Sequence, residues 1–500
     1  MSLKVVFQHS SIYLVGDLIR RPISLLLLPF YTRYLTPADY GIIELLDLAI
    51  MVISLVVGLS AAGDALVRIY HEQTTVRNRN AAVSTILCVL AAVGFVSSAG
   101  AMAMAMPLSM WLFHADYTHL IRLALLCISF GAVTETLMLY LQIKGRPVRF
   151  VCFSVTQTIS LVGFNVYFIG GRGMGVEGFV LSKCIVLITV ATVLLIFTIR
   201  ETGFRFSWTI ARSFASFGAP LILSSLSTFS IHFSDRFFVA RFCTLADLGV
   251  YALAYKVGML VSILVGGPFG SVWNATFYSR LSEENWRSEF GRTALYLSAA
   301  SALVSVGLSV FARPVLGIAV TTGYMGAIAL VPIIAFSYAI RVIGDFFKAI
   351  LFISKRSRLF GGICTGCALL NLTLNAVLIP RYGIYGAALA TLATWAAYLG
   401  LCWGYAQREH RIPYSVRSFA TLFVIAVLVS IAGGARLTAC VPLQFLMASA
   451  LSTVFVVAVF AFGCFPSHER AVLFQHATAT ASGLVAAVRR TNRRPEVFRA

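Results

Sequence analysis

Charged residues are scarce in this 500-residue chain, and acidic residues are the scarcest. Asp, Glu, Lys and Arg make up 12% of the sequence, with 19 Asp+Glu against 39 Lys+Arg. Hydrophobic residues make up 59%, and the mean hydropathy is +0.88. A soluble domain could not hide so much apolar surface, whereas a protein embedded in lipid need not. The composition therefore excludes a soluble globular fold and predicts a membrane protein.

Signatures of soluble catalytic chemistry are also missing. No G-x-x-x-x-G-K-[ST] phosphate loop occurs, which argues against ATP hydrolysis. Cys364 and Cys367 form a C-x-x-C inside an apolar run without partner ligands, so we expect neither a metal nor a cofactor. The first apolar run contains Asp17, Arg20 and Arg21, which predicts a full membrane span rather than a cleavable signal.

Apolar windows of about 20 residues, the length that a helix needs to cross a bilayer, recur along the chain. They are continuous rather than alternating, which excludes a transmembrane β-barrel. We expect an all-α polytopic membrane protein with about 14 transmembrane helices. The predicted spans are 10–31, 41–63, 81–106, 118–142, 150–170, 176–199, 214–239, 249–272, 293–312, 325–353, 359–379, 384–405, 416–435 and 442–464.

The positive charges follow a membrane topology. With the N-terminus in the cytoplasm, most of the 39 Lys+Arg fall in inward segments and few in outward ones, as the positive-inside rule predicts. This alternation favours an even number of helices and cytoplasmic N- and C-termini. The net charge of +20 therefore reflects topology, and we expect no nucleic-acid partner. The tail after Pro466 is basic, which suits either the anionic lipid surface or the solvent.

A nine-residue motif occurs twice, as RYLTPADYG at 33–41 and as RFCTLADLG at 241–249, each in a polar break between apolar runs. Gly175-Val-Glu-Gly178 and Gly383-Ile-Tyr-Gly386 recur at the same interval. An even number of predicted helices separates equivalent points, so the copies should be parallel repeats about an axis along the membrane normal. We expect a six-helix lobe at 1–205, a second at 206–410, two peripheral helices in 411–465 and a basic cytoplasmic tail at 466–500.

Charged residues inside apolar runs are candidates for function, because each costs about 2.5–3.5 kcal/mol at the bilayer centre. In the first predicted helix, Asp17, Arg20 and Arg21 are three and four residues apart, so Asp17 can pair with either arginine. Pro22 and Pro29 should bend this helix. One arginine would suffice for a buried ion pair, so the second favours a role in a cavity.

Two further predicted helices carry clusters of charge. Arg341, Asp345 and Lys348 are spaced to share one helix face, which suits either a cationic cavity wall or a salt-bridged helix contact. Asp235 and Arg236 are adjacent and point about 100° apart, so they cannot line one narrow stripe. Near its helix end, Arg236 either lines the cavity or reaches the membrane surface.

Single charges complete the set of candidates. Lys256 is a further cavity candidate. Glu135 has no partner within its own helix, so it either meets a cation such as Lys183 or is protonated. Glu44 and Asp47 lie near the start of a predicted helix, where the helix dipole accounts for them.

The buried charges sum to a surplus of cations. Surplus cations suit an anionic substrate, and guanidinium groups match phosphate geometry. An exporter of cationic drugs should instead show surplus carboxylates. The buried charges also depart from the repeat, since Arg236 corresponds to Leu28 in the first half.

The segments LPFYTRYLTPADYGIIELL (28–46) and RFCTLADLGVYALAYKVG (241–258) and the paired G-[VI]-x-G turns resemble the polysaccharide-biosynthesis flippases. These are oligosaccharide-lipid translocases within the MATE-related multidrug, oligosaccharidyl-lipid and polysaccharide flippase superfamily. The resemblance covers about residues 10–410. It implies two six-helix lobes around a central cavity that opens to either side in turn, and no enzymatic activity.

The resemblance also implies a substrate of sugar units on an undecaprenyl-pyrophosphate-type carrier, such as O-antigen, capsule or exopolysaccharide repeat units. Arg20 and Arg21 match, by location, the first-helix arginines that hold the pyrophosphate in related lipid II flippases. Arg236 and Lys256 match the second-lobe arginines approximately. A coupled proton or sodium ion would be held at Asp17 or Glu135.

Other functions remain open from the sequence alone. A polysaccharide polymerase or ligase acting on the same lipid would need a large outward catalytic domain, and every predicted outward loop is short. An ion-coupled small-molecule exporter and a membrane subunit of an exopolysaccharide synthase complex both fit the predicted fold. Membrane lipids, and polysaccharide polymerase and glycosyltransferase partners, are expected around a bacterial inner-membrane flippase.

Overall fold

The computed structural model describes residues 27–59, 62–270, 273, 284–413, 415–434 and 440–465, and these residues form helices and short connections without a strand. The principal helices are α2 (Leu28–Tyr34), α3 (Pro37–Val56), α4 (Ala62–Glu72), α5 (Val76–Ala103), α6 (Ala105–Phe113), α7 (Thr118–Ile143), α8 (Pro147–Asn165), α9 (Gly175–Thr202), α10 (Trp208–Phe242), α11 (Leu245–Gly258), α13 (Trp286–Ala319), α14 (Ala327–Ile353), α15 (Ser357–His410), α16 (Val416–Gly434) and α17 (Val441–Ala461). Short π-helices at Val166–Gly171 and Ser262–Gly266 extend α8 and follow α11, and a 3-10 turn spans Thr322–Tyr324.

The all-helical membrane architecture is confirmed. Within the described residues, ten helices are long and apolar enough to cross a membrane, so the predicted number of 14 stays a prediction. Two predicted spans merge into the 54-residue α15, which bends at Gly383. The predicted span 41–63 is instead broken near Gly58, which has a φ of +82°. Most of the predicted first span lies outside the described residues.

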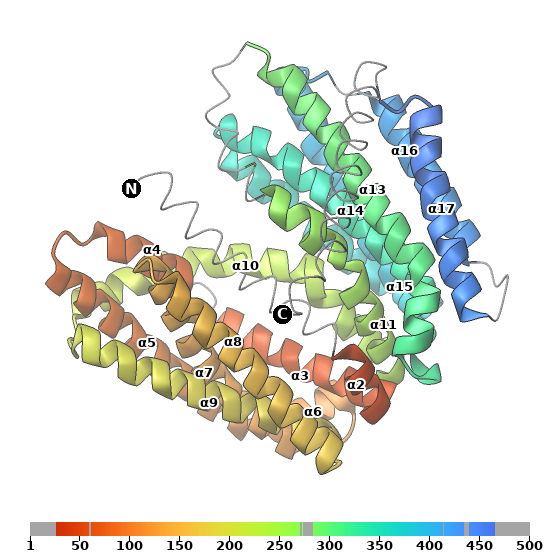
Figure 1. The fold of residues 1–500 in the computed structure, drawn as a ribbon. Helices are drawn as coiled ribbons and strands as arrows, with labels where there is room; N and C mark the ends of the chain where they lie inside the picture. Colours follow the sequence, from red (N-terminus) through yellow and green to blue (C-terminus); the bar gives the residue numbers. More distant parts are fainter. Residues whose placement is uncertain are drawn as a thin grey trace, which may run out of the picture.

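The helices gather in two groups that diverge from a common junction (Figure 1). The first group contains α3 to α9, and the second contains α11 and α13 to α17 (Figure 1). The long helix α10 runs between the groups and packs on α3, α4 and α5 as well as on α15 (Figure 1). Helices α16 and α17 lie at the edge of the second group against α13 (Figure 1).

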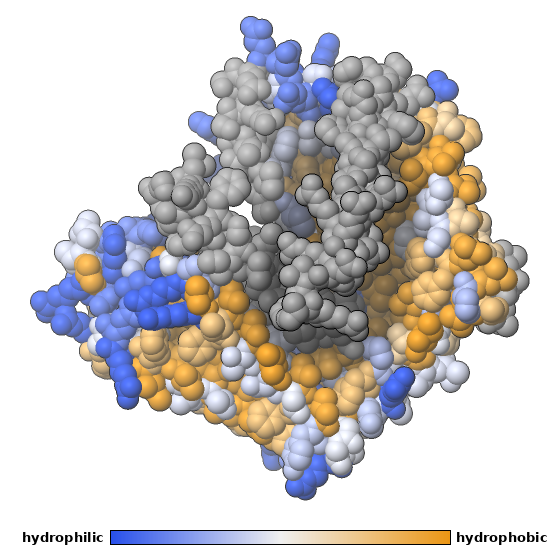
Figure 2. Space-filling model, in the orientation of Figure 1, coloured by the Kyte–Doolittle hydropathy of each residue, from blue (hydrophilic) through white to orange (hydrophobic). Residues whose placement is uncertain are grey.

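Both groups present a broad hydrophobic surface, which Figure 2 shows in orange. Large apolar side chains such as Val96, Ile431 and Leu446 are exposed. Hydrophilic residues gather instead over the end of the first group that carries α4 (Figure 2). An apolar band with polar ends is the surface that a bilayer requires.

The repeated nine-residue motif forms the starts of α3 and α11. In each copy the threonine hydroxyl accepts a hydrogen bond from the backbone N–H of an aspartate three residues later, and the aspartate carboxylate accepts one from the threonine backbone N–H. The Thr36 hydroxyl and Asp39 form one such capping box, and Thr244 and Asp247 form the other. These reciprocal bonds satisfy backbone donors that a helix start leaves free, so the polar motif residues fix where both helices begin.

The glycines that end the two motifs hold α3 and α11 together. A Cβ atom added to Gly41 would lie 2.0 Å from the Leu245 carbonyl oxygen, and one added to Gly249 would lie 1.9 Å from that of Pro37. The two contacts are mirrored, because Pro37 and Leu245 occupy the same position in the two motifs. Only glycine allows backbones to approach this closely, so the last residue of each motif lets α3 and α11 cross in backbone contact.

The second repeated motif, at 175–178 and 383–386, requires glycine because of its backbone conformation. Gly175 and Gly383 both adopt positive φ, at +54° and +58°. A Cβ atom on the partner glycines would crowd the preceding helix end, at Phe168 for Gly178 and at the Leu378 carbonyl for Gly386. The chain therefore makes the same tight reversal in both halves.

A further equivalence appears at the opposite helix ends. Arg146, in the turn after α7, forms an ion pair with Glu201 at the end of α9. Arg356, in the turn after α14, lies 3.8 Å from Glu409 near the end of α15. Each arginine also closes its turn by donating its backbone N–H to a carbonyl five residues earlier. The duplication thus extends to both ends of the helices.

Candidate functional site

One face of α3 receives three cations from three other helices. Tyr40, Glu44 and Asp47 are four and three residues apart, so they lie on one side of the helix. The partners are Lys256 of α11, Arg236 of α10 and Lys183 of α9, with nitrogen–oxygen distances of 2.5, 2.6 and 2.6 Å respectively. We call these six residues the charged seam.

Arg236 is the most enclosed member of the seam. It is 3% exposed, and besides Glu44 it donates to the His232 carbonyl at 2.9 Å and to the Asp235 carboxylate at 3.1 Å. Its guanidinium also lies 4.2 Å from the centre of the Tyr255 ring. Asp235 is held in turn by the Tyr251 hydroxyl at 2.5 Å. A buried charge needs such complete pairing, because removing it from water is costly.

These contacts exclude one of the two alternatives for Arg236 and one of those for Glu135, and they correct the account of Glu44 and Asp47. Arg236 does not reach the membrane surface, because Glu44 and Asp235 hold it inside the protein. Lys183 pairs with Asp47 rather than with Glu135, which is exposed and has no hydrogen bond or ion pair to any described residue. The helix dipole is not a sufficient account of Glu44 and Asp47, since both carboxylates meet cations from other helices.

The seam and Asp235 together are balanced in charge. Arg236, Lys183 and Lys256 face the carboxylates of Glu44, Asp47 and Asp235. The surplus of cations expected from the sequence is therefore not located here.

A surplus cation is found on α14. Arg341, Asp345 and Lys348 share one face, as their spacing predicted: Asp345 lies 3.6 Å from Arg341 and 2.9 Å from Lys348. The Tyr398 hydroxyl of α15 donates to Asp345 at 3.1 Å. All three charged side chains are partly exposed, by 27–37%. Two cations share one carboxylate in this cationic cluster of Arg341, Asp345, Lys348 and Tyr398.

Two aromatic rings contact Arg341. Its guanidinium lies 5.6 Å from the centre of the Tyr338 ring and 5.2 Å from that of Trp395. The centre of the His232 ring lies 5.1 Å from that of the Trp395 ring. To the described residues Arg341 donates no hydrogen bond, so its N–H groups can serve a ligand. A stacked, partly exposed guanidinium of this kind is well suited to bind a phosphate or carboxylate.

A buried amide network fixes α10 on α15 beside these residues. Ser234 of α10 donates to Asn371 at 3.2 Å, and Asn371 donates to Thr394 at 3.1 Å. Asn375 donates to Asn371 at 2.9 Å. All four side chains are at most 7% exposed. The network therefore sets the position of the neighbouring His232 and Arg236 relative to the second group.

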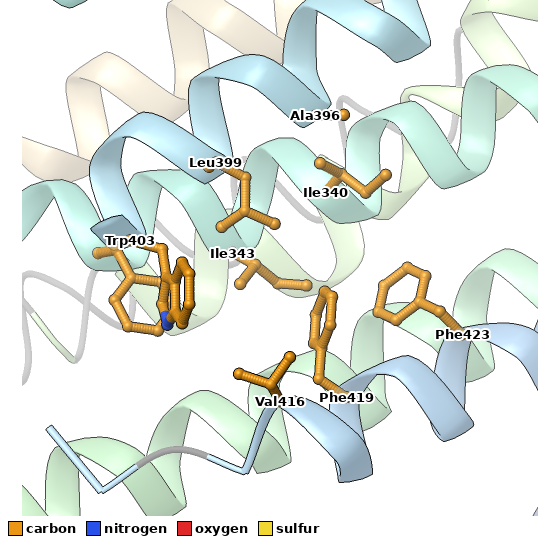
Figure 3. Close-up of a pocket in the computed structure, with 10 residues that line it drawn as sticks. Ile340, Ile343, Ala396, Leu399, Trp403, Val416, Phe419 and Phe423 are labelled. Carbon is orange, nitrogen blue, oxygen red and sulfur yellow. The ribbon is translucent and has the colours of Figure 1, made fainter. Parts of the chain in front are cut away.

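An apolar pocket of about 340 Å³ adjoins the cationic cluster. Ile340, Ile343, Ala396, Leu399, Trp403, Val416, Phe419 and Phe423 surround it, from α14, α15 and α16 (Figure 3). Ile340 precedes Arg341, and Leu399 follows Tyr398. The pocket and the cluster thus occupy neighbouring faces of the same two helices.

The structure brings some predicted site residues together and leaves others apart. Arg236 and Lys256 belong to the seam, whereas Arg341, Asp345 and Lys348 belong to the cluster. Asp17, Arg20 and Arg21 lie outside the described residues.

The sequence analysis attributed Glu44 and Asp47 to the helix dipole alone, and it missed the other residues that complete the two sites, namely Tyr40, His232, Trp395 and Tyr398. The helical spacing of Tyr40, Glu44 and Asp47 was a usable signal for these three. The others are reached only through contacts between helices.

Comparison with known proteins places the chain in a family. The profile of the family described as polysaccharide biosynthesis protein matches residues 30–329. Protein 1 of the Lsg locus of Haemophilus influenzae is 25% identical over 272 residues, which are 52% of this chain. This chain spans 63% of the length of that curated relative.

Two solved structures share the fold at low identity. The lipid II flippase MurJ in an inward closed conformation has a TM-score of 0.66 and 12% identity, covering 89% of this chain and 97% of that one. An inward-facing MATE multidrug transporter of the MOP superfamily has a TM-score of 0.63 and 13% identity, covering 78% and 94%. With the fold of these transporters and a profile match over residues 30–329, the chain belongs to the polysaccharide biosynthesis protein family.

Proposed function

We propose that the protein is a flippase that moves a polyprenyl-pyrophosphate-linked oligosaccharide, such as a repeat unit of O-antigen, capsule or exopolysaccharide, from the cytoplasmic to the outer leaflet. Family membership supports a role in polysaccharide biosynthesis, and the shared fold supports transport. In this proposal the lobes at 1–205 and 206–410 alternate in access, both chain ends are cytoplasmic, and the bacterial inner membrane is the site of action.

The observation that carries the proposal is the cationic cluster on α14. Among the described residues, Arg341 and Lys348 share the single carboxylate of Asp345, so the cluster keeps a net positive charge, and Arg341 donates no hydrogen bond to any of them. A pyrophosphate or an acidic sugar would satisfy these donors with charge-assisted hydrogen bonds. We assign Arg341 and Lys348 to the substrate and propose that Arg20 and Arg21 hold the same anionic group from the first helix.

The adjoining pocket supports a lipid-linked substrate. Its lining is hydrocarbon and aromatic, and it lies one residue away from Arg341 along α14. A prenyl chain in the pocket would place its anionic headgroup toward the cluster. An anion site and an apolar site on neighbouring helix faces thus support this substrate class.

Substitution of Arg341 tests the assignment. In proteoliposomes, Arg341→Gln should slow flipping of a fluorescent prenyl-pyrophosphate disaccharide by roughly 10- to 100-fold, because one to two charge-assisted hydrogen bonds are lost. Arg172→Gln is the matched control, since Arg172 is exposed and contacts Tyr167 in the turn before α9. Equal rates for both variants would refute the role of Arg341.

The same vesicles distinguish the alternative functions. Drug efflux that depends on a proton or sodium gradient, with no lipid movement, would instead identify an ion-coupled exporter. Stable co-purification with a glycosyltransferase or a polymerase, without flipping by the chain alone, would identify a synthase subunit.

A further inference from the structure

We propose that the charged seam is a latch between the two helix groups, in which Glu44 and Arg236 hold the junction closed and separate when the protein changes state. The proposal removes Arg236 and Lys256 from the substrate site. It rests on the proposed function only in requiring that the protein changes between two states, and not on the identity of the substrate.

The seam lies next to the crossing of α3 and α11, where the two helix groups meet. Glu44 follows the Gly41–Gly249 crossing by one helical turn, and Tyr40 immediately precedes it. Beyond the crossing, the Tyr324 hydroxyl donates to the Leu35 carbonyl and the Thr321 hydroxyl donates to the Thr32 carbonyl, both at 3.0 Å. The Thr32 hydroxyl donates to the Ala319 carbonyl at 3.2 Å. Polar bonds thus join the two groups on either side of the backbone crossing.

The ion pair between Arg236 and Glu44 connects the two helix groups. Arg236 is anchored in the second group, because its neighbours Ser234 and Asp235 bind Asn371 and Tyr251. Glu44 belongs to α3 in the first group. The 2.6 Å bond between them therefore crosses from one group to the other, whereas the bond from Lys183 to Asp47 joins two helices of the first group.

The charge of Arg236 remains compensated when the ion pair with Glu44 breaks. When Glu44 withdraws, Arg236 keeps Asp235 and the His232 carbonyl on its own helix, so its charge is not left alone in the protein. Water entering the parted junction would solvate Glu44. The buried pair can therefore break without stranding a charge in apolar surroundings, which would otherwise be prohibitive. Such an arrangement suits a contact that is made and broken repeatedly.

A pair of α3 variants tests the latch. Glu44→Gln removes the ion pair between the groups and leaves at most a weaker neutral hydrogen bond, and Asp47→Asn does the same to an ion pair within the first group. We would measure hydrogen–deuterium exchange of the full-length protein in nanodiscs of phosphatidylethanolamine and phosphatidylglycerol, without substrate. Glu44→Gln should raise exchange in residues 36–47 and 244–256 by roughly tenfold or more, and Asp47→Asn should leave residues 244–256 unchanged. Equal exchange of residues 244–256 in both variants would overturn the proposal.

A milder variant covers the case in which Glu44→Gln does not fold. Tyr40→Phe removes only the hydroxyl that binds Lys256, the second bond between α3 and the other group. It should also raise exchange at 244–256, and unchanged exchange there would equally overturn the latch. Because no substrate is present, a chain that fails to flip the lipid can still show the Glu44-specific effect, so the two proposals fail separately.

Discussion

At the scale of single residues, glycine has the greatest influence on how the two groups meet. Gly41 and Gly249 bring α3 and α11 into backbone contact, and each lies against a carbonyl of the opposite helix. A methyl group has no room at either position. The shared glycine of the repeated motif is thus a requirement of the helix crossing.

Alanine at the crossing should therefore destabilise the protein. Gly41→Ala would place a Cβ atom 2.0 Å from the Leu245 carbonyl oxygen, and relief requires the helices to separate. We expect a loss of about 1–3 kcal/mol, as for other overpacked interiors, measured by thermal unfolding in detergent.

Gly307→Ala provides the control for this substitution. Gly307 lies within α13, and apart from its chain neighbours and the backbone of its own helix no described atom lies within 4 Å of an added Cβ. The change should be neutral or stabilising by about 0.5–1 kcal/mol, because alanine favours the helix. A Gly41→Ala protein as stable as Gly307→Ala would contradict the close crossing.

At the scale of helices, the capping boxes determine where α3 and α11 begin and thus where the seam residues point. Tyr40 and Glu44 follow the Thr36 cap by four and eight residues, so a shift in the helix start would rotate them away from Lys256 and Arg236. By fixing the helix start, the polar residues of the repeat thus orient the seam residues of α3.

Removal of a cap should loosen the first turn of its helix. Thr36→Ala and Thr244→Ala should each cost about 1 kcal/mol, seen as faster hydrogen exchange in the first turn of α3 or α11. Thr189→Ala should have little effect, because Thr189 is exposed and its hydroxyl donates to the Ile185 carbonyl within α9. Unchanged exchange in both cap variants would show that packing alone fixes the helix starts.

Helix composition and spacing were readable from the sequence, and partners across helices were not. The motif pair predicted the duplication, and the spacing of Arg341, Asp345 and Lys348 predicted their shared face. The partners of Glu44, Asp47 and Lys183 depend on which helices become neighbours, which no local pattern specifies. The break near Gly58 was missed because the apolar run continues across it.

At the scale of the whole molecule, the distribution of charge separates two roles. The seam at the junction is balanced, whereas the cluster on α14 retains a positive charge beside an apolar pocket. In our proposals, the first region closes the protein and the second receives the substrate.

Transport of an anionic headgroup should respond to the membrane potential. Moving one net negative charge outward is favoured by about 2.3 kcal/mol per 100 mV, inside negative, which is about a 50-fold change in the equilibrium ratio between leaflets. A potassium diffusion potential set with valinomycin in proteoliposomes should therefore drive accumulation of the labelled lipid in the outer leaflet. Accumulation that ignores the potential would indicate an electroneutral, ion-coupled cycle.

The glycine crossing also determines how far the helix ends move in any such transport cycle. Helix α13 ends at Ala319 beside Thr32 at the junction, and its 34 residues extend about 50 Å from there at 1.5 Å per residue. With a fulcrum at the Gly41–Gly249 contact, a tilt of about 10° would displace the far end of α13 by roughly 9 Å, while the contact itself barely moves. A small rotation at the two glycines thus produces a displacement of several ångströms at the far end of α13.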